Sequence, residues 1–160
     1  MQDRITIAQE RPDQPQVVEL LASLDRYLAM LYPPEANFIM DVQALLAPEV
    51  SFFVARDGDQ IVGTGAFRRM QGEAATGGAP YGEIKRMYVD PSRRGERIGA
   101  RLLQTLEDTL RSEGYRLALL ETGPEQLEAV RLYERCGYQQ RGVFGLYPDN
   151  GLSAYYSKAL

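Results

Sequence analysis

Four arginines and two glycines gather in one short stretch of the chain, VDPSRRGERIGARLL. Arg93, Arg94 and Arg97 stand just before the apolar pattern of a helix, where the positive end of the helix dipole repels cations unless an anion lies between them. Gly95 and Gly99 allow a close approach to the backbone, and the first amides of a helix have no partner within it. A strand that runs into such a turn directs these amides at one point, which favours an anion there. The stretch therefore predicts a polyphosphate site, and a pyrophosphate would balance the arginines.

Two common phosphate-binding patterns do not account for this stretch. A nucleotide P-loop needs GxxxxGK(S/T), and the chain contains no such run. A dinucleotide fold needs GxGxxG after its first strand, whereas this turn comes late in the chain and in another pattern. The alternative is a solvated arginine face beside unrelated glycines. The agreement of strand, turn and helix favours the phosphate site.

The elements around this turn predict one mixed α/β domain over residues 1–160. The patterns indicate strands at 4–8, 51–56, 60–69, 82–89, 116–121, 138–143 and 152–158. They indicate helices at 15–31, 41–47, 98–113 and 124–136. Helices on both faces of a central sheet would bury that sheet and hold the arginine turn at its edge.

Composition excludes several classes of chemistry. The net charge is −4, which argues against a nucleic-acid partner. The chain has no histidine, so Ser/His/Asp catalysis, Cys/His catalysis and imidazole metal sites are excluded. Its single cysteine, Cys136, excludes an intrachain disulfide and a cysteine-built zinc site, and we expect no metal.

The N-terminal segment MQDRITIAQERPDQPQ lacks the basic start and apolar run of a signal peptide. No stretch of the sequence is apolar for long enough to span a bilayer. These two features predict a cytoplasmic protein without a membrane partner.

Four segments together resemble the GNAT acyltransferase superfamily: GEIKRMYVDP, RGERIGARLL, LALLETG and QLEAVRLYERCGY. The superfamily's phosphate motif, Q/R-x-x-G-x-G/A, follows its fourth strand, and the resemblance covers nearly the whole chain. It implies a central mixed, mostly antiparallel sheet flanked by helices on both faces. Two positions depart from the pattern. Arg97 stands where the motif usually has glycine, and Gln126 replaces an asparagine common seven residues before the helix tyrosine.

The resemblance implies that acetyl-CoA is the cosubstrate. Its pantetheine would lie along the end of the fourth strand and its pyrophosphate on the following turn, with one contact from the next helix. The implied cofactor-binding residues are Met87, Tyr88, Val89, Arg94, Gly95, Glu96, Arg97, Ile98, Gly99, Ala100 and Gln126.

Acetyl transfer to an amine needs a base, because an amine is mostly protonated at neutral pH, and the departing thiolate benefits from a proton donor. By its spacing to the phosphate motif, Glu83 resembles the superfamily's base, with Glu121 as the second candidate. Tyr133 occupies the position of the general acid. Glu83 could equally be an edge carboxylate in a salt bridge, and Tyr133 a core tyrosine. A covalent intermediate on Cys136 is disfavoured, because a small buried residue is the commoner role at a helix end.

The acceptor site is less well defined by the sequence. The segment LYPPEANF lies where the superfamily lines its acceptor pocket, and the late polar loop could cover it. The implied substrate-binding residues are Tyr32, Glu35, Asn37, Phe38 and Tyr147. If Glu35, Glu83 and Glu121 converge, they form an acidic site for a cationic amine. The acceptor would be a primary amine of a small molecule or peptide, and the resemblance also allows a homodimer.

Two functions from different classes follow. The first is an N-acetyltransferase that moves the acetyl group of acetyl-CoA directly to the amine within a ternary complex. The second is a non-catalytic sensor that binds acyl-CoA. An enzyme turns over a suitable acceptor, whereas a sensor shows only stabilisation by its ligand.

Overall fold

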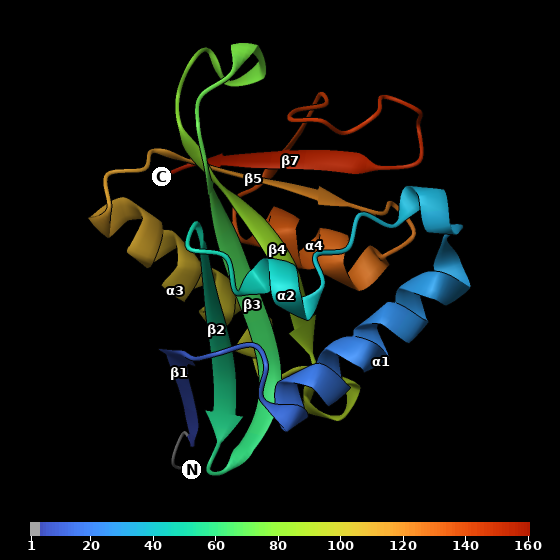
Figure 1. Cartoon of the computed structure of the whole chain (residues 1–160), viewed down its shortest axis with the longest axis vertical. Coiled ribbons are helices and arrows are strands. Elements are labelled where there is room, and N and C mark those ends of the chain that lie inside the picture. The colour runs from blue at the N-terminus through green and yellow to red at the C-terminus, as the bar shows by residue number, and fades with distance from the viewer. Residues whose placement is uncertain (1–3) are drawn as a thin grey trace.

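Seven strands form one sheet in the computed structural model, which describes residues 4–160 (Figure 1). The strands are β1 (Ile5–Gln9), β2 (Val50–Asp57), β3 (Gln60–Met70), β4 (Tyr81–Val89), β5 (Leu117–Thr122), β6 (Gln139–Arg141) and β7 (Ala154–Ala159). The α-helices are α1 (Pro15–Leu31), α2 (Val42–Leu45), α3 (Ile98–Ser112) and α4 (Leu127–Arg135). Short 3-10 helices cover Pro34–Ala36, Ala74–Thr76 and Pro91–Arg93.

The strands lie in the order β1-β2-β3-β4-β5-β7-β6. Neighbouring strands are antiparallel except for β4 and β5, which are parallel. The mixed, mostly antiparallel sheet expected from the sequence is therefore confirmed. Because β7 lies between β5 and β6, the last strand of the chain pairs on both sides.

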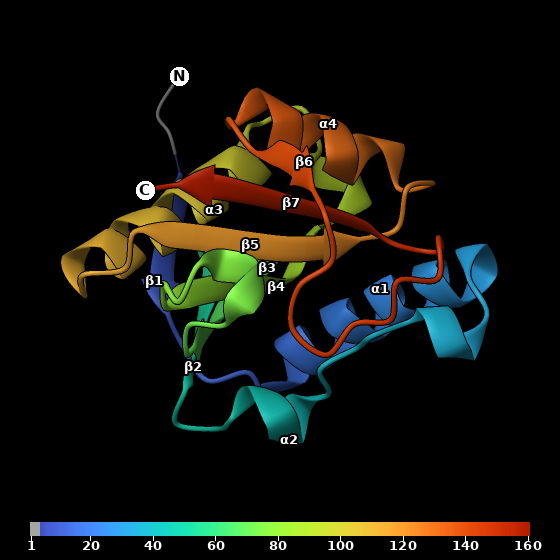
Figure 2. The same ribbon diagram turned by 90° about the horizontal axis from the view of Figure 1, so that it is seen from above.

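Helices cover both faces of the sheet, with α3 and α4 on one face and α1 and α2 on the other (Figure 2). Side chains alternate between the two faces along a strand. Phe52 and Val54 of β2 accordingly pack with residues of α1 and α2, whereas Phe53 and Ala55 join the core beneath α3. Among residues 4–160, no helix is long and apolar enough to cross a membrane.

Helix α3 lies close against the sheet because its apolar residues share one face. Each of the following is at most 1% exposed: Ile98, Leu102, Leu103, Leu106 and Leu110. Gly82 of β4 permits this approach, since a Cβ atom there would lie 2.5 Å from the Leu110 side chain. The start of α3 is thereby fixed beside the end of β4.

Most elements differ from the sequence prediction by one or two residues at their ends, α2 and β7 among them, and two differences affect the site or the edge of the sheet. The predicted helix at 124–136 begins only at Leu127, because the Gln126 amide donates to the Gly123 carbonyl in a turn. The predicted strand at 138–143 shortens to three residues, which pair with β7 alone at the edge of the sheet. The loop before β7 is correspondingly longer.

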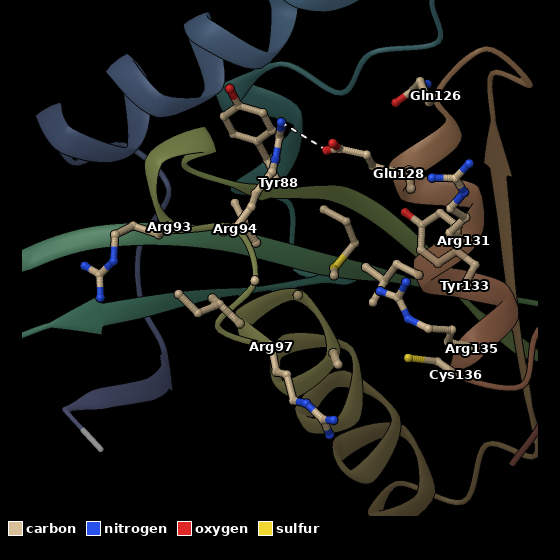
Figure 3. Close-up of a pocket in the computed structure, with 18 of the residues that line it drawn as sticks. Tyr88, Arg93, Arg94, Arg97, Gln126, Glu128, Arg131, Tyr133, Arg135 and Cys136 are labelled. Atoms are coloured by element: carbon tan, nitrogen blue, oxygen red, sulfur yellow. Dashed lines mark ion pairs between the residues drawn. The ribbon is translucent and has the colours of Figure 1, made fainter. Parts of the chain in front are cut away.

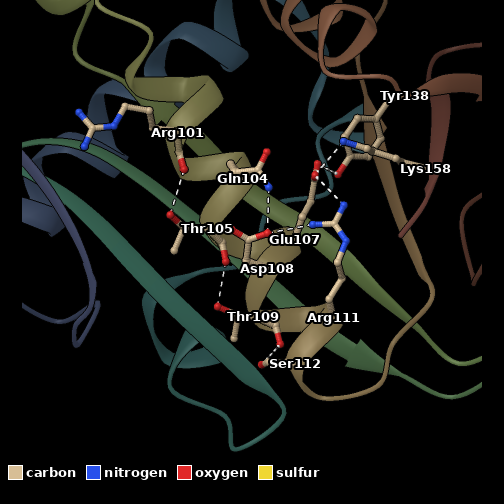
Figure 4. Close-up of polar contacts among 10 residues, drawn as sticks. All are labelled: Arg101, Gln104, Thr105, Glu107, Asp108, Thr109, Arg111, Ser112, Tyr138 and Lys158. Carbon is tan, nitrogen blue, oxygen red and sulfur yellow. Dashed lines mark hydrogen bonds and ion pairs between the residues drawn. The ribbon is translucent and has the colours of Figure 1, made fainter.

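A buried ionic cluster ties the second half of α3 to the strands at the far edge of the sheet (Figure 4). Glu107 is 1% exposed and accepts hydrogen bonds from Lys158 Nζ at 2.8 Å and from the Tyr138 hydroxyl at 3.0 Å. Arg111 Nη2 lies 3.8 Å from the same carboxylate. Burial, reinforced by the Glu107 charge, raises the pKa of Tyr138. The chain thus supplies every partner that this carboxylate needs.

Candidate active site

Strands β4 and β5 separate soon after they meet. Their pairing is limited to Gly82 with Ala118 and Glu83 with Leu119, and Figure 1 shows the two strands diverging beyond that point. The later part of β4 therefore has an edge without a neighbouring strand. Such an edge presents amides and carbonyls that can pair with an extended ligand.

A β-bulge lies in this part of β4. Arg86 and Met87 together stand opposite Gly65 of β3, and Arg86 takes a left-handed backbone angle, φ 56°. The Thr64 hydroxyl donates to the Arg86 carbonyl at 2.8 Å. Bulges bend a strand and redirect its side chains, so this one sets the direction of β4 at the opening.

A pocket of about 960 Å³ occupies the space between the end of β4, the start of α3 and helix α4 (Figure 3). Ten of the predicted cofactor-binding residues line it: Met87, Tyr88, Val89, Arg94, Gly95, Arg97, Ile98, Gly99, Ala100 and Gln126. Glu96 does not line it. The volume is typical of a site for a whole cofactor. We call this space the cofactor pocket.

Unpaired amides form one wall of the cofactor pocket. Within the described part of the chain, the backbone N–H groups of residues 97 to 100 make no backbone hydrogen bond. Gly95 has φ 88°, and Arg97 at the helix cap has φ 62°. Arg97 thus adopts the left-handed conformation that favours glycine, which agrees with the glycine usual at this motif position. The amides form a concave donor set suited to an anion.

The predicted arginines differ in how they are paired. Arg93 is engaged by the chain, since its guanidinium lies 2.7 Å from Glu96 and 3.0 Å from Asp57. Arg94 Nη1 lies 3.0 Å from Glu128 Oε2 of α4, and Figure 3 shows this side chain spanning the pocket. Both partners of that pair are exposed, so a bound phosphate could replace Glu128 at low cost.

Helix α4 adds residues that the sequence analysis did not identify. Glu128, Arg131 and Arg135 line the cofactor pocket from this helix. Their spacing of three and four residues places them on one helical face, which was the available signal. Cys136 also lines the pocket, and burial raises the pKa of its thiol, which lowers its nucleophilic character.

Tyr133 stands where the cofactor pocket meets a second pocket, and it lines both. The residue is 7% exposed, and its ring packs edge-on against the Tyr138 ring, with the two ring centroids 5.9 Å apart. The Tyr133 hydroxyl has no hydrogen-bond partner among residues 4–160. Burial, with the charge of Glu121, raises its pKa, so the phenol keeps its proton at neutral pH.

The second pocket, of about 90 Å³, lies between the end of α1, the segment after it, and the diverging ends of β4 and β5. We call it the acceptor pocket. It is lined by Leu24, Leu28, Tyr32, Ala36, Asn37, Phe38, Ile39, Ile84, Lys85, Arg86, Met87, Glu121, Thr122, Gly123, Gln126 and Tyr133. Glu35 is exposed and lines neither pocket. Of the three glutamates that would form an acidic site if they converged, only Glu121 lines this pocket.

Two of the predicted acceptor residues shape the pocket through their own contacts. The Tyr32 hydroxyl accepts from the Glu125 amide at 3.0 Å, and burial raises its pKa to about 12. Its ring fills the space beside Gly123, where a Cβ atom would lie 1.9 Å from the hydroxyl oxygen. Asn37 Nδ2 donates to the carbonyl of Tyr32 at 3.4 Å and so holds the turn that follows α1.

The two candidate bases have different surroundings. Glu83 is 5% exposed, accepts a short hydrogen bond from the Tyr147 hydroxyl, and does not line the acceptor pocket. Lys85 Nζ lies 3.8 Å from Glu83 and donates to the Tyr147 hydroxyl at 2.9 Å. Glu121 does line the pocket, and its carboxylate accepts from the Ser153 hydroxyl at 2.6 Å. Burial raises the pKa of Glu121.

Comparisons with known proteins agree with this geometry. The Acetyltransferase (GNAT) family matches residues 16–138. An IAA acetyltransferase of Azospirillum brasilense is 44% identical over 156 residues, which cover 98% of each chain. A solved structure from Klebsiella pneumoniae, described as a candidate acyl-CoA N-acyltransferase, is 32% identical, with TM-score 0.79 over 98% of this chain and 97% of that one.

A GNAT acetyltransferase of Elizabethkingia anophelis, solved with acetyl-CoA bound, shares the fold. Its TM-score is 0.64 at 18% identity, over 99% of this chain and 100% of that one. The chain described here belongs to the GNAT acetyltransferase family, whose members are acetyl-CoA-dependent N-acetyltransferases. Within residues 4–160, no group of three acidic, cysteine or histidine side chains is placed to hold a metal.

Proposed function

We propose that this protein transfers the acetyl group of acetyl-CoA to the primary amine of a small molecule, directly within a ternary complex. The observation that carries the proposal is the meeting of two pockets at Tyr133. One pocket has the size and donors for a nucleotide cofactor, and the other has room only for a small group. The short acceptor pocket favours a small molecule over a peptide chain.

The residues of the cofactor pocket fit acetyl-CoA. The unpaired amides at the head of α3 and Arg94 suit a pyrophosphate, and the open edge of β4 from Met87 to Val89 suits the amides of pantetheine. Bound acetyl-CoA supplies the reactive acetyl thioester. Glu96 supports the turn through Arg93 in this proposal and does not contact the cofactor.

Two side chains move the protons of the reaction. Glu121 accepts the proton that the amine loses as its new C–N bond forms, and its raised pKa brings it nearer to the working pH of a base. Tyr133 donates its proton to the sulfur as the C–S bond breaks. Glu121 then releases its proton to solvent and the Tyr133 phenolate regains one, so each turnover converts a neutral amine and acetyl-CoA into an acetylated amine and free CoA. Glu83 is the second candidate base, held by Tyr147 and Lys85.

Thermal unfolding with acetyl-CoA, free CoA or ATP tests the cofactor assignment. Both CoA forms should raise the unfolding temperature, and ATP should not reproduce the shift. Arg94→Ala should weaken the shift, whereas Arg68→Gln, which removes an arginine outside both pockets, should leave it unchanged.

Thiol release with a panel of small primary amines tests the reaction itself. Release that requires both acetyl-CoA and an amine supports the enzyme. A CoA-dependent shift without turnover of any amine would favour the sensor, and no shift with either CoA form would contradict both functions. A cytoplasmic location and a homodimer stay predictions.

A further inference from the structure

Arg86 is a buried cation whose guanidinium is only partly satisfied. Its side chain is 5% exposed, and Nη1 donates to Asp25 Oδ1 at 2.7 Å. Its Nε is the one buried side-chain nitrogen or oxygen without a hydrogen-bond partner among residues 4–160. Leaving a buried charged donor unpaired is costly, and such groups usually mark a missing partner.

Arg86 lines the acceptor pocket, and so does its neighbour Lys85. Residues 84 to 87 of β4 all line this pocket, because the strand has no neighbour on that edge beyond Glu83 and the β-bulge interrupts the usual alternation of faces. Lys85 Nζ donates to the Phe38 carbonyl at 3.2 Å and to the Tyr147 hydroxyl at 2.9 Å. An ammonium has three donors, so one remains for a ligand.

The nearby carboxylates do not supply the missing acceptor. Asp25 is 41% exposed and does not line the acceptor pocket, and Glu83 is held by Tyr147 outside it. Glu121 is the one acidic residue in the lining, and it already accepts from Ser153. The lining therefore has two cations and one carboxylate, and unused donors on the cationic side.

We propose that the acetyl acceptor is a small amino acid whose carboxylate binds Arg86 and Lys85. This inference rests on the proposed function and names the substrate class of the same site. A planar carboxylate matches the fork of a guanidinium. With the carboxylate on this wall, the amine of the same molecule faces Glu121 and Tyr133, which line the pocket with them. A pocket of about 90 Å³ has room for such a head group, and a second cation on the acceptor would be repelled.

The test compares acceptors that differ only in charge. Glycine, alanine and serine are assayed with acetyl-CoA by thiol release, beside their carboxamides and the amines that lack the carboxyl group. We expect kcat/KM for the acids to exceed that for the carboxamides on the order of tenfold to a hundredfold. Aminomethylphosphonate separates a carboxylate from a larger tetrahedral anion, and it should be the poorer acceptor. A preference for the phosphonate would overturn the proposal that the acceptor's anionic group is a carboxylate.

Variants assign the preference to the two cations. Arg86→Gln should lower kcat/KM for the acids about tenfold or more and leave that for the carboxamides within about threefold. Arg86→Gln could unfold, because it breaks the pair with Asp25, so Lys85→Gln is measured beside it and should give the same selective loss. Arg68→Gln changes a partly exposed arginine on β3 that lines neither pocket. It is the matched control and should keep the preference.

A binding measurement gives a readout that does not require turnover. Alanine should raise the unfolding temperature of the protein saturated with free CoA, and alaninamide should not. Carboxamides or simple amines that match the acids would overturn the inference and leave the acetyltransferase intact. Failure of every acid to react or bind would also overturn it, whereas the CoA-dependent shift decides the proposed function separately.

Discussion

The two ends of α3 differ in whether the chain itself supplies partners for their polar groups. In the second half, Glu107 is buried, and Lys158, Tyr138 and Arg111 supply its partners from within the chain (Figure 4). At the head of the helix, the amides of residues 97 to 100 make no backbone hydrogen bond in the described structure, and Arg97 adopts a conformation that suits glycine. A polar group that the chain satisfies stabilises the fold, whereas one left open beside a pocket indicates a ligand. The same contrast separates Glu107 from Glu121 and Arg86.

The sharpest test of this contrast is Glu121→Gln. We expect kcat/KM to fall on the order of a thousandfold, because the amide cannot accept the proton of the amine. The parent should lose activity as the pH falls through the raised pKa of Glu121, and the variant should lose that pH dependence. Glu83→Gln, at the second candidate base, is measured beside it. A larger loss from Glu83→Gln than from Glu121→Gln would assign the base to Glu83.

Although Glu121→Gln should lower the activity, we expect it to preserve or raise the stability of the fold. A raised pKa means that the native state holds this proton more tightly than the unfolded state, so the free energy of unfolding decreases as the pH rises between the two pKa values. Removing the charge should therefore leave the unfolding temperature at neutral pH equal to that of the parent or higher. A clearly lower unfolding temperature for the variant would show that the Glu121 charge stabilises the fold, as the Glu107 charge does.

Tyr133→Phe should have a smaller effect on the rate. We expect kcat to fall on the order of a hundredfold with acetyl-CoA binding retained, since a thiolate is a fair leaving group even without a proton donor. Tyr138→Phe keeps the neighbouring ring and loses the bond to Glu107, so it should lower stability and leave kcat unchanged. Equal rates for Tyr133→Phe and the parent would remove Tyr133 from the chemistry.

Glu107→Gln tests the satisfied half of the helix. The variant should lower the free energy of unfolding by about 1–3 kcal/mol, measured by urea denaturation, because Lys158 loses its charged partner in a buried site. kcat per folded molecule should not change. Asp108→Asn, on the exposed side of the same turn, should stay within about 0.5 kcal/mol of the parent. If Glu107→Gln lost activity without losing stability, Glu107 would not be a purely structural charge.

The smallest expected effect belongs to Arg97→Gly. Glycine adopts the left-handed angle without the cost of about 1 kcal/mol that a side chain adds, but it also gives the unfolded chain more freedom. The two terms nearly cancel, so the unfolding temperature should change little. The Kd for CoA, measured by calorimetry, should stay within about threefold. A much weaker Kd would show that the Arg97 charge contacts the phosphates.

Much of the fold followed from the sequence, because its signals are local. The apolar spacing of α3, the Asp-Gly turn between β2 and β3 and the proline pair after α1 each fix one element or its end. The ends of α4 and β6 did not follow, because tertiary contacts decide them. Gly123 makes room for Tyr32, and β6 exists only where β7 provides a partner.

The candidate site was less accessible to sequence reasoning than the fold. The phosphate turn is contiguous in the chain, so its residue types and spacing carried the prediction. The acceptor pocket joins four separate segments, and the bulge that brings Lys85 and Arg86 together has no sequence signature. Whether Glu83 or Glu121 lines that pocket depends on the divergence of β4 from β5, which a linear pattern does not encode.

The position of β7 between β5 and β6 has a consequence for the order of assembly. The chain is synthesised with β6 before β7, and β7 is the only strand of the described chain with which β6 pairs. A nascent chain that ends before Ala154 can form the hairpin of β2 and β3 and pair β4 with β5, but it leaves the outer edge of β5 exposed. That edge and its apolar residues would be open to aggregation or chaperone capture until the last strand emerges. Closure of the sheet, and with it the completed wall around Glu121, is therefore expected only after β7 has been synthesised.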